Sequence, residues 1–223
     1  MNHIEWDKEK IRLLYGTSNP SKLMFMKEIV KELNIEVIGL KELNLELDSI
    51  DESGNNPLEN ARIKALAYYE AYKKPVFSCD SGLYIEGIEE YRQPGVHVRR
   101  VHGKTLNDEE MIEYYSALAK ELGGEMRVKY KNAICLVMDK ENIFCYDGED
   151  IGSEEFIIGS KPHKNRDKGF PLNSLSIHID SGKYYMDIKE NDYALNKNCK
   201  EKSMLQDNGF RKFFKSSILK YYN

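Results

Sequence analysis

Small polar residues and one lysine follow a short apolar run near the start of the chain. Residues 12–15 have β character, and residues 16–21 are small, polar or turn-forming. Apolar residues then recur at helical spacing from Met26 to Leu33. A strand, a tight loop and a helix in this order present backbone N–H groups at a helix N-terminus, where an anion is favoured.

Lys22 falls in the first turn of this expected helix, where the helix dipole disfavours a cation. A bound phosphate would explain the lysine, with Thr17 and Asn19 as further donors. The alternative is an ordinary strand–helix turn capped by Asn19 or Ser18, with Lys22 in solvent. The stretch alone leaves both interpretations open.

Three acidic residues, Asp51, Glu59 and Asp80, stand where loops meet regular elements. We expect Asp80 at the carboxyl end of a strand over residues 75–79, the side on which α/β sheets bind ligands. Mg²⁺ uses one or two carboxylates together with substrate phosphate oxygens, and a carboxylate can activate water. The alternative is structural: Glu59 satisfies a helix N-terminus, and Asp80 caps a turn through Ser81 and Gly82.

Strand and helix patterns alternate in the first half of the chain, which predicts an α/β fold with parallel pairing. The second half predicts an antiparallel meander, a basic loop and a C-terminal helix that packs its aromatic face on the core rather than on a membrane. The expected strands are residues 36–40, 75–79, 128–138, 143–146, 154–158 and 175–179. The expected helices begin at Pro57 (capped by Asn56), at Asn107 and at Met204. An extended basic segment follows the turn at Pro94–Gly95, and residues 161–171 form the basic loop.

Composition describes an ordinary globular enzyme of 223 residues, with 41% apolar and 31% charged residues. The net charge of −4 gives no global attraction for nucleic acid. The N-terminus does not resemble a signal peptide, and no apolar run has membrane-spanning length. Four cysteines without a C-x-x-C pair and five scattered histidines favour a reduced cytoplasmic protein without structural zinc.

Four motifs in the first half of the chain resemble those of the inosine/xanthosine triphosphate pyrophosphatases, the Ham1-like enzymes that remove noncanonical purine nucleotides. The sequence at Thr17–Lys22 is similar to T-x-N-x-x-K, and Glu59–Ala65 to E-N-A-x-x-K-A. Cys79–Leu83 resembles D-D-S-G-L, and Pro94–Arg100 resembles P-G-x-x-x-x-R. Because the four motifs occur in the family's order, they are far more specific than any one of them.

The resemblance implies one α/β domain over residues 1–223, with two lobes around a long mixed sheet, flanking helices and a central cleft. Residues 1–124 would carry the phosphate and metal site, and residues 125–223 would form a strand-rich lobe with the C-terminal helix. It also implies a homodimer that hydrolyses a nucleoside triphosphate to monophosphate and pyrophosphate with Mg²⁺. By position, Asp80 and Lys22 would be catalytic; Asp80, Glu59 and Asp51 would hold the metal; and the substrate would contact Thr17, Ser18, Asn19, Lys22, Lys64, Ser81, Arg100, Phe170 and Asn173.

Three departures concern the metal and the base. Cys79 replaces the first acid of the pair, and a thiol is a poor magnesium ligand. Gly169–Ser174 stands where the family has G-F-G-Y-D-P, so Phe170 is kept for stacking while Asn173 replaces the acid. Cys199–Glu201 stands where the family's base-reading S-H-R is expected. The base preference is therefore open.

Two other functions stay open beside the pyrophosphatase. A nucleotide-binding protein that has lost turnover would act as a sensor or partner subunit, and a triphosphate would raise its melting temperature without forming product. A hydrolase of another phosphorylated metabolite would release orthophosphate instead of pyrophosphate.

Overall fold

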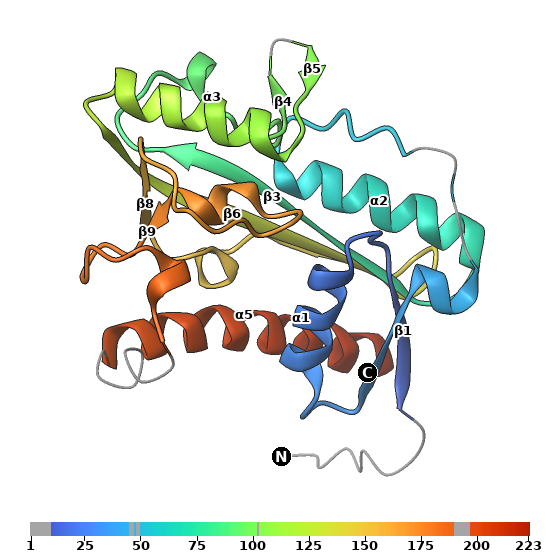
Figure 1. Cartoon of the computed structure of the whole chain (residues 1–223). Helices are drawn as coiled ribbons and strands as arrows, with labels where there is room; N and C mark the ends of the chain where they lie inside the picture. Colours follow the sequence, from blue (N-terminus) through green and yellow to red (C-terminus); the bar gives the residue numbers. More distant parts are fainter. Residues whose placement is uncertain (1–9, 45–46, 48–49, 102, 190–196) are drawn as a thin grey trace. The chain divides into compact units, whose positions relative to one another are not determined.

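The computed structural model describes residues 10–44, 47, 50–101, 103–189 and 197–223. Figure 1 shows the chain coloured along its sequence. The α-helices are α1 (Pro20–Val30), α2 (Pro57–Tyr72), α3 (Asp108–Glu121) and α5 (Lys197–Tyr222). The strands are β1 (Ile11–Tyr15), β2 (Ile35–Gly39), β3 (Val76–Ile85), β4 (Arg100–Val101), β5 (Lys104–Thr105), β6 (Glu125–Val137), β7 (Ile143–Tyr146), β8 (Phe156–Gly159) and β9 (Ser176–Ile177).

The described chain forms two compact units, each assembled from separate stretches of sequence. Unit 1 comprises residues 1–80, 132–151 and 206–223, and unit 2 comprises residues 81–131 and 152–205. The long strands β3 and β6 are each divided between the two units. The unit boundaries therefore differ from the expected division at residue 124.

Unit 1 is built on a mixed sheet in the order β2-β1-β3-β6, with β7 also paired to β6. β1 is parallel to both β2 and β3, whereas β6 and β7 form an antiparallel hairpin. Leu13 and Leu14 are both fully buried although successive strand residues point to opposite faces. Both faces of this sheet are therefore covered, as expected for parallel strands.

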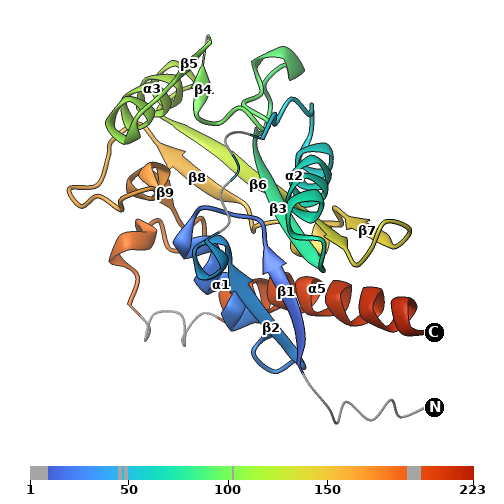
Figure 2. The same ribbon diagram turned by 90° about the vertical axis from the view of Figure 1, so that its right-hand side faces the viewer.

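The two covered faces of unit 1 carry different helices. Met26, Ile29 and Val30 of α1 pack with four aromatic or aliphatic residues of α5, namely Phe210, Phe213, Phe214 and Ile218. Ala61, Ala65, Tyr68 and Tyr69 of α2 pack in a separate cluster with Leu14, Val76 and Cys135. Figure 2 shows α1 and α2 on either side of β1. The expected docking of the aromatic C-terminal face on the core is confirmed.

Unit 2 combines α3 with parts of β3 and β6 and with β8 and β9. β8 is antiparallel to β6 and β9 is antiparallel to β8. The buried side chains Met111, Ile112, Tyr115 and Ala119 of α3 pack on residues of these strands. A short antiparallel pair, β4 and β5, forms a second sheet.

The starts of α1, α2 and α3 agree with the sequence prediction because their caps are local, whereas α5 begins at Lys197, before the expected start at Met204. Asn19, Asn56 and Asn107 each cap a helix through the side chain, and Gly123 and Gly124, which have positive φ, follow the end of α3. Three strand predictions need correction. Residues 96–99 form turns rather than an extended piece, the strand expected at 175–179 shrinks to the two residues of β9, and β8 pairs with β6 rather than continuing a meander from β7.

Candidate functional site

The loop between β1 and α1 is the first component of the site. Asn19 accepts hydrogen bonds through Oδ1 from the backbone N–H groups of Ser21 (2.9 Å) and Lys22 (3.3 Å). Thr17 Oγ1 accepts from the backbone N–H of Asn19 at 3.2 Å. The Asn19 cap fixes the start of α1, and Lys22 lies in its first turn, as the sequence predicted. No acidic residue occupies this turn, so Lys22 meets the helix dipole without local compensation.

Gly16 fixes the loop against the neighbouring strand. Its backbone N–H donates to Phe77 O (2.8 Å), and its carbonyl accepts from Ser78 Oγ (2.9 Å). A Cβ at this position would lie 2.4 Å from both Ser78 Oγ and a ring carbon of Tyr68. Only glycine allows this close approach. The start of the loop is therefore bonded directly to β3, two residues before Asp80.

Asp80 lies inside β3, and the prediction that it ends a strand is wrong. β3 continues through Gly82 to Ile85, because Leu83 forms a bridge with Gly95 by two backbone hydrogen bonds of 2.9 and 3.0 Å. A Cβ on Gly82 would be 3.0 Å from the Gly95 carbonyl carbon. Gly82 therefore allows the backbones of β3 and Gly95 to pack closely and does not form a turn after Asp80. The capping alternative for Asp80 is excluded for the same reason.

Although β3 continues, Asp80 still lies beyond the carboxyl end of β1. The last residue of β1, Tyr15, is in register with Phe77, three positions before Asp80. The Gly16–Ser21 loop and Asp80 therefore share the rim that the sequence predicted.

The Asp80 carboxylate is held by two side chains from α2. Lys64 Nζ lies 2.6 Å from Oδ1, and Asn60 Nδ2 donates to Oδ2 at 3.3 Å. Asp80 is 8% exposed and Asn60 is fully buried, so solvent screens this group only weakly. Helical spacing places Asn60 and Lys64 on one side of α2. Asp80 is thus fixed in position and paired with a cation.

Glu52 joins this cluster and was missed by the sequence analysis. Its Oε2 lies 3.5 Å from Lys64 Nζ, so the ammonium group bridges two carboxylates. Asn60 was also missed; its Oδ1 accepts from the backbone N–H of Gly54 at 2.9 Å and ties the acidic turn to α2. Asn60 could have been predicted as a site residue from its place inside the E-N-A motif. Nothing in the sequence distinguished Glu52 from the neighbouring Asp51.

Glu59 serves the N-terminus of α2. Its carboxylate accepts from the backbone N–H of Asn55 (2.8 Å) and from Asn56 Nδ2 (2.9 Å), while its own N–H donates to Asn56 Oδ1. The structural alternative for Glu59 therefore describes its contacts. Asp51 is exposed on the preceding turn. Among the residues that the structure describes, no three His, Cys, Asp or Glu side chains converge as metal ligands, so Asp80, Glu59 and Asp51 do not form one cluster.

Cys79 lies on the opposite face of β3 from Asp80, because successive strand residues alternate. It packs against the α1 and α5 side of the sheet. Burial raises the pKa of its thiol to about 11, although a hydrogen bond from Tyr15 and the charges of Lys22 and Lys64 act in the other direction. The residue that replaces an acid therefore carries no charge at neutral pH.

The donor chemistry near Asp80 fits magnesium better than a softer metal. Asp80 and Glu52 provide hard carboxylate oxygens. The ammonium group of Lys64 lies between these two carboxylates, so the two oxygens already bind a cation. Mg²⁺ needs only one or two carboxylates when substrate phosphates complete its shell. Cys79 faces away and does not compete.

The remaining predicted substrate residues belong to unit 2. Ser81 directly follows Asp80 in β3, and Arg100 begins β4. Phe170 is partly buried, and its carbonyl accepts from the Asn173 N–H at 3.0 Å, while Asn173 Nδ2 donates to Asp167 Oδ2 at 2.8 Å. The side chains of Cys199–Glu201 lie outside the described residues. Phe170 thus ends the basic loop, and Asn173 lies in the short 3₁₀ helix Pro171–Ser174 that follows it.

Two acidic residues at the start of α3 anchor that loop. Asp108 accepts from the Gly169 N–H (2.9 Å) and from Arg99 (2.8 Å), and these bonds lower the pKa of its carboxyl group. Glu109 pairs with Arg166 at 2.9 Å. The basic loop is therefore held at Arg166 and at Gly169 by the N-terminus of α3.

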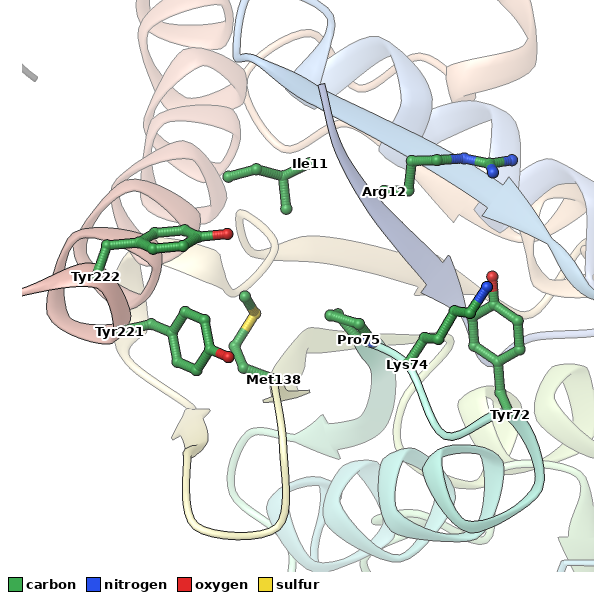
Figure 3. A pocket seen from close by; sticks show the side chains of 8 residues that line it. All are labelled: Ile11, Arg12, Tyr72, Lys74, Pro75, Met138, Tyr221 and Tyr222. Carbon is green, nitrogen blue, oxygen red and sulfur yellow. The ribbon is translucent and has the colours of Figure 1, made fainter. Parts of the chain in front are cut away.

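A separate pocket of about 280 Å³ in unit 1 lies at the other end of β1 (Figure 3). Tyr221 and Tyr222 reach it from α5, and the Lys74 ammonium lies 5.7 Å from the centre of the Tyr72 ring. Because Ile11 and Arg12 open β1 while the Gly16–Ser21 loop follows its end, this pocket is not part of the candidate site.

Three kinds of comparison relate the chain to known proteins. The Ham1 family model matches residues 13–170. The dITP/XTP pyrophosphatase of Aquifex aeolicus is 45% identical over 92 residues, which are 41% of this chain and 43% of that protein. The dITP/XTP pyrophosphatase of Clostridium tetani is 32% identical over 187 residues, 81% of this chain and 85% of that protein. The structure of a HAM1 protein from Coxiella burnetii matches with a TM-score of 0.66 at 20% identity, covering 96% of this chain and 100% of that one.

Proposed function

Because this chain belongs to the Ham1 family, we propose that it hydrolyses a noncanonical purine nucleoside triphosphate to the monophosphate and pyrophosphate. The relatives in Aquifex aeolicus and Clostridium tetani carry the name dITP/XTP pyrophosphatase, and the second alignment spans most of both chains. The observation that carries the proposal is the Asp80 carboxylate, fixed by Lys64 and Asn60 on the same rim as the Thr17–Lys22 loop.

In this proposal the loop holds the triphosphate. Lys22 supplies a full charge, Thr17, Ser18 and Asn19 supply short-range polar contacts, and α1 directs its N-terminus at the phosphates. The Asn19 cap and the Gly16 contact to β3 keep these groups in one arrangement before the substrate arrives. Such preorganisation lowers the cost of charge development in the transition state.

Asp80 accepts the proton of the attacking water. The hydrogen bonds from Lys64 and Asn60 orient its two oxygens, and the Lys64 charge also faces the substrate's phosphates in this arrangement. Asp80 and Glu52 would hold Mg²⁺, with Glu59 and Asp51 as further candidates from the family resemblance. When bound, the ion supplies charge neutralisation on the phosphate oxygens.

Unit 2 provides the residues proposed for the rest of the substrate: Ser81, Arg100, Phe170 and Asn173. Phe170 would stack on the base, and Asn173 would hydrogen-bond to it or to the sugar. The match to the family model ends at residue 170, before Asn173 and Cys199–Glu201. We also propose that the protein is cytoplasmic and that it works as a homodimer. Light scattering on the purified protein tests the dimer.

A panel of ITP, XTP, dITP, GTP, ATP and pyrimidine triphosphates with Mg²⁺ tests the proposal. Pyrophosphate and orthophosphate are assayed separately. Pyrophosphate from ITP, dITP or XTP at a higher kcat/KM than from GTP or ATP supports the proposed activity. Orthophosphate in place of pyrophosphate contradicts it and favours a different phosphohydrolase.

The neutral Cys79 thiol is the one observation that favours a second function, a nucleotide sensor. One negative charge fewer beside the site weakens its attraction for a divalent cation. A sensor would show a rise in melting temperature with a triphosphate and no product of either kind. Turnover of any triphosphate in the panel rejects this alternative.

A further inference from the structure

Two cysteines face each other across the β6–β7 hairpin of unit 1. Cys135 and Cys145 are register partners in the antiparallel ladder, between the pairs Ile134–Tyr146 and Leu136–Phe144. Their Sγ atoms are 2.7 Å apart, and both thiols are free. An S–S bond is about 2.05 Å long, so less than an ångström of movement separates the contact from a covalent bond.

The hairpin holds this register firmly. Asp139 Oδ1 accepts from the backbone N–H groups of Glu141 and Asn142, each at 2.9 Å, and so fixes the turn between the strands. Directly opposed residues in antiparallel strands have Cα atoms about 4.5 or 5.5 Å apart. Disulfides span Cα distances of roughly 4.4–6.8 Å. The backbone can therefore accept the bond without changing register.

The two thiols differ in access and in charge. Cys135 is fully buried among Ala133, Val137 and residues of α2, while Cys145 is partly exposed. When Cys145 ionises, the Cys135 thiol donates a hydrogen bond to it, and Arg62 on α2 donates another at 3.9 Å. These bonds lower the pKa of Cys145 to about 7, against burial and the charge of Asp147. The same coupling raises the pKa of Cys135.

We propose that Cys135 and Cys145 form a thiol redox site that hydrogen peroxide closes into a disulfide. The Cys145 thiolate attacks the peroxide, forming an S–O bond as the O–O bond breaks, which gives a sulfenic acid and water after proton transfer. The Cys135 sulfur then attacks Cys145 Sγ, the S–O bond breaks, and a second water leaves with the Cys135 proton. The two thiols together lose two electrons, and one hydrogen peroxide is reduced to two waters.

The arrangement fits a dithiol better than a metal site. A structural zinc centre needs more ligands than two sulfurs, and no group of three metal-binding side chains occurs among the residues that the structure describes. The sulfur contact is also too short for two ligands of one ion, because each would stand about 2.3 Å from it in a tetrahedral arrangement. The sequence alone does not predict this pair, because the spacing of Cys135 and Cys145 matches no known motif.

Mass mapping of the intact chain tests the proposal. The reduced protein is treated with hydrogen peroxide, blocked with an alkylating agent and digested without reductant. Trypsin cuts after Lys131, Lys140 and Lys164, so Cys135 and Cys145 fall in separate peptides, 132–140 and 141–164. We expect a linked peptide that reductant separates, formed at a rate that rises with pH as Cys145 ionises. The bond should also raise the melting temperature by about 5 °C, because it constrains the unfolded chain.

Matched variants separate the two steps. Cys145→Ser should leave Cys135 reduced, because the remaining thiol is buried, whereas Cys135→Ser should leave Cys145 as a sulfenic acid that dimedone traps. Cys79→Ser should still give the linked peptide. Irreversible oxidation of Cys145 in the native chain, or a disulfide between Cys79 and either partner, would overturn the proposal. The wild-type digest decides the question even where a variant folds poorly.

Discussion

The candidate site residues of unit 1 and those of unit 2 are held in different ways. In unit 1, Asp80 and the start of the loop are bonded to elements distant in sequence, through Lys64, Asn60 and the Gly16–Ser78 contact. In unit 2, Phe170 and Asn173 lie at the end of the basic loop and just after it, and this loop is anchored to the start of α3 by the exposed Arg166–Glu109 ion pair and by the Gly169–Asp108 hydrogen bond. The difference suggests that the phosphate chemistry is fixed in the scaffold, whereas substrate choice is left to a replaceable surface loop.

Of the substitutions in unit 1, Asp80→Asn should reduce activity most. Asparagine keeps the size but cannot accept a proton, so we expect kcat to fall by about 10²–10⁴-fold. Pyrophosphate release measures the effect. Because Lys64 loses its charged partner, a melting curve must establish that the variant is folded at the assay temperature. Glu36→Gln, on an exposed pair with Arg12, is the control; comparable losses in both variants would contradict the role of Asp80.

Lys22→Ala should have the next largest effect. Loss of a charge-assisted bond to phosphate, roughly 1.5–3 kcal/mol, raises KM for the triphosphate by about 10- to 100-fold. Lys27→Ala, in an exposed ion pair on the same helix, is the matched control. Initial rates over a range of substrate concentrations separate KM from kcat. An unchanged KM in the Lys22 variant would remove the loop from substrate binding.

Substitutions in unit 2 should alter selectivity more than rate. Phe170→Ala removes a stacking surface and should raise KM by about 10-fold, with kcat within a factor of about three. Asn173→Ala should change the ratio of kcat/KM between XTP and dITP. Tyr91→Ala, at a highly exposed position of the same unit, controls for general effects. A large fall in kcat for every base would show that the two regions are not separable in this way.

A pH effect on stability should be the smallest. The pKa of Cys79 is raised to about 11, above the ordinary thiol value of 9.0, so the folded state holds its proton more tightly than the unfolded state. Stability from this group is complete below pH 9 and declines as pH rises through 11, by about 2.7 kcal/mol at most. Urea unfolding at pH 8, 9 and 10 measures the slope. Cys79→Ala should flatten it; an equal slope in both proteins would assign it to other groups, such as Tyr15.

Local signals in the sequence predicted the parts of the fold that depend on neighbouring residues. Asn19, Asn56 and Asn107 marked helix starts because a cap acts within three residues. The extent of β3 could not be predicted in this way, since Asp80–Gly82 stays extended only because Gly95 pairs with Leu83.

The same limit applied to the site. The four motifs identified the loop, Asp80 and Lys64, but the pairing of Lys64 with Glu52 depends on how the acidic turn folds back on α2. The contacts of Glu59 within the N-terminus of its own helix were a local effect, and the structural alternative anticipated them. The facing of Cys135 and Cys145 required the hairpin register, which the cysteine spacing alone does not reveal.

The discontinuous make-up of unit 1 also determines when this protein can acquire its core. The first 80 residues share a hydrophobic cluster with Phe210, Phe213 and Phe214, and Arg211 Nε donates to the backbone carbonyl of Ile29. During synthesis, one face of the sheet around β1 therefore stays uncovered until α5 has been made. Contacts of such long sequence separation slow folding and prolong the exposure of apolar surface. A nascent chain that stops before α5 is consequently the form of this protein most prone to aggregate.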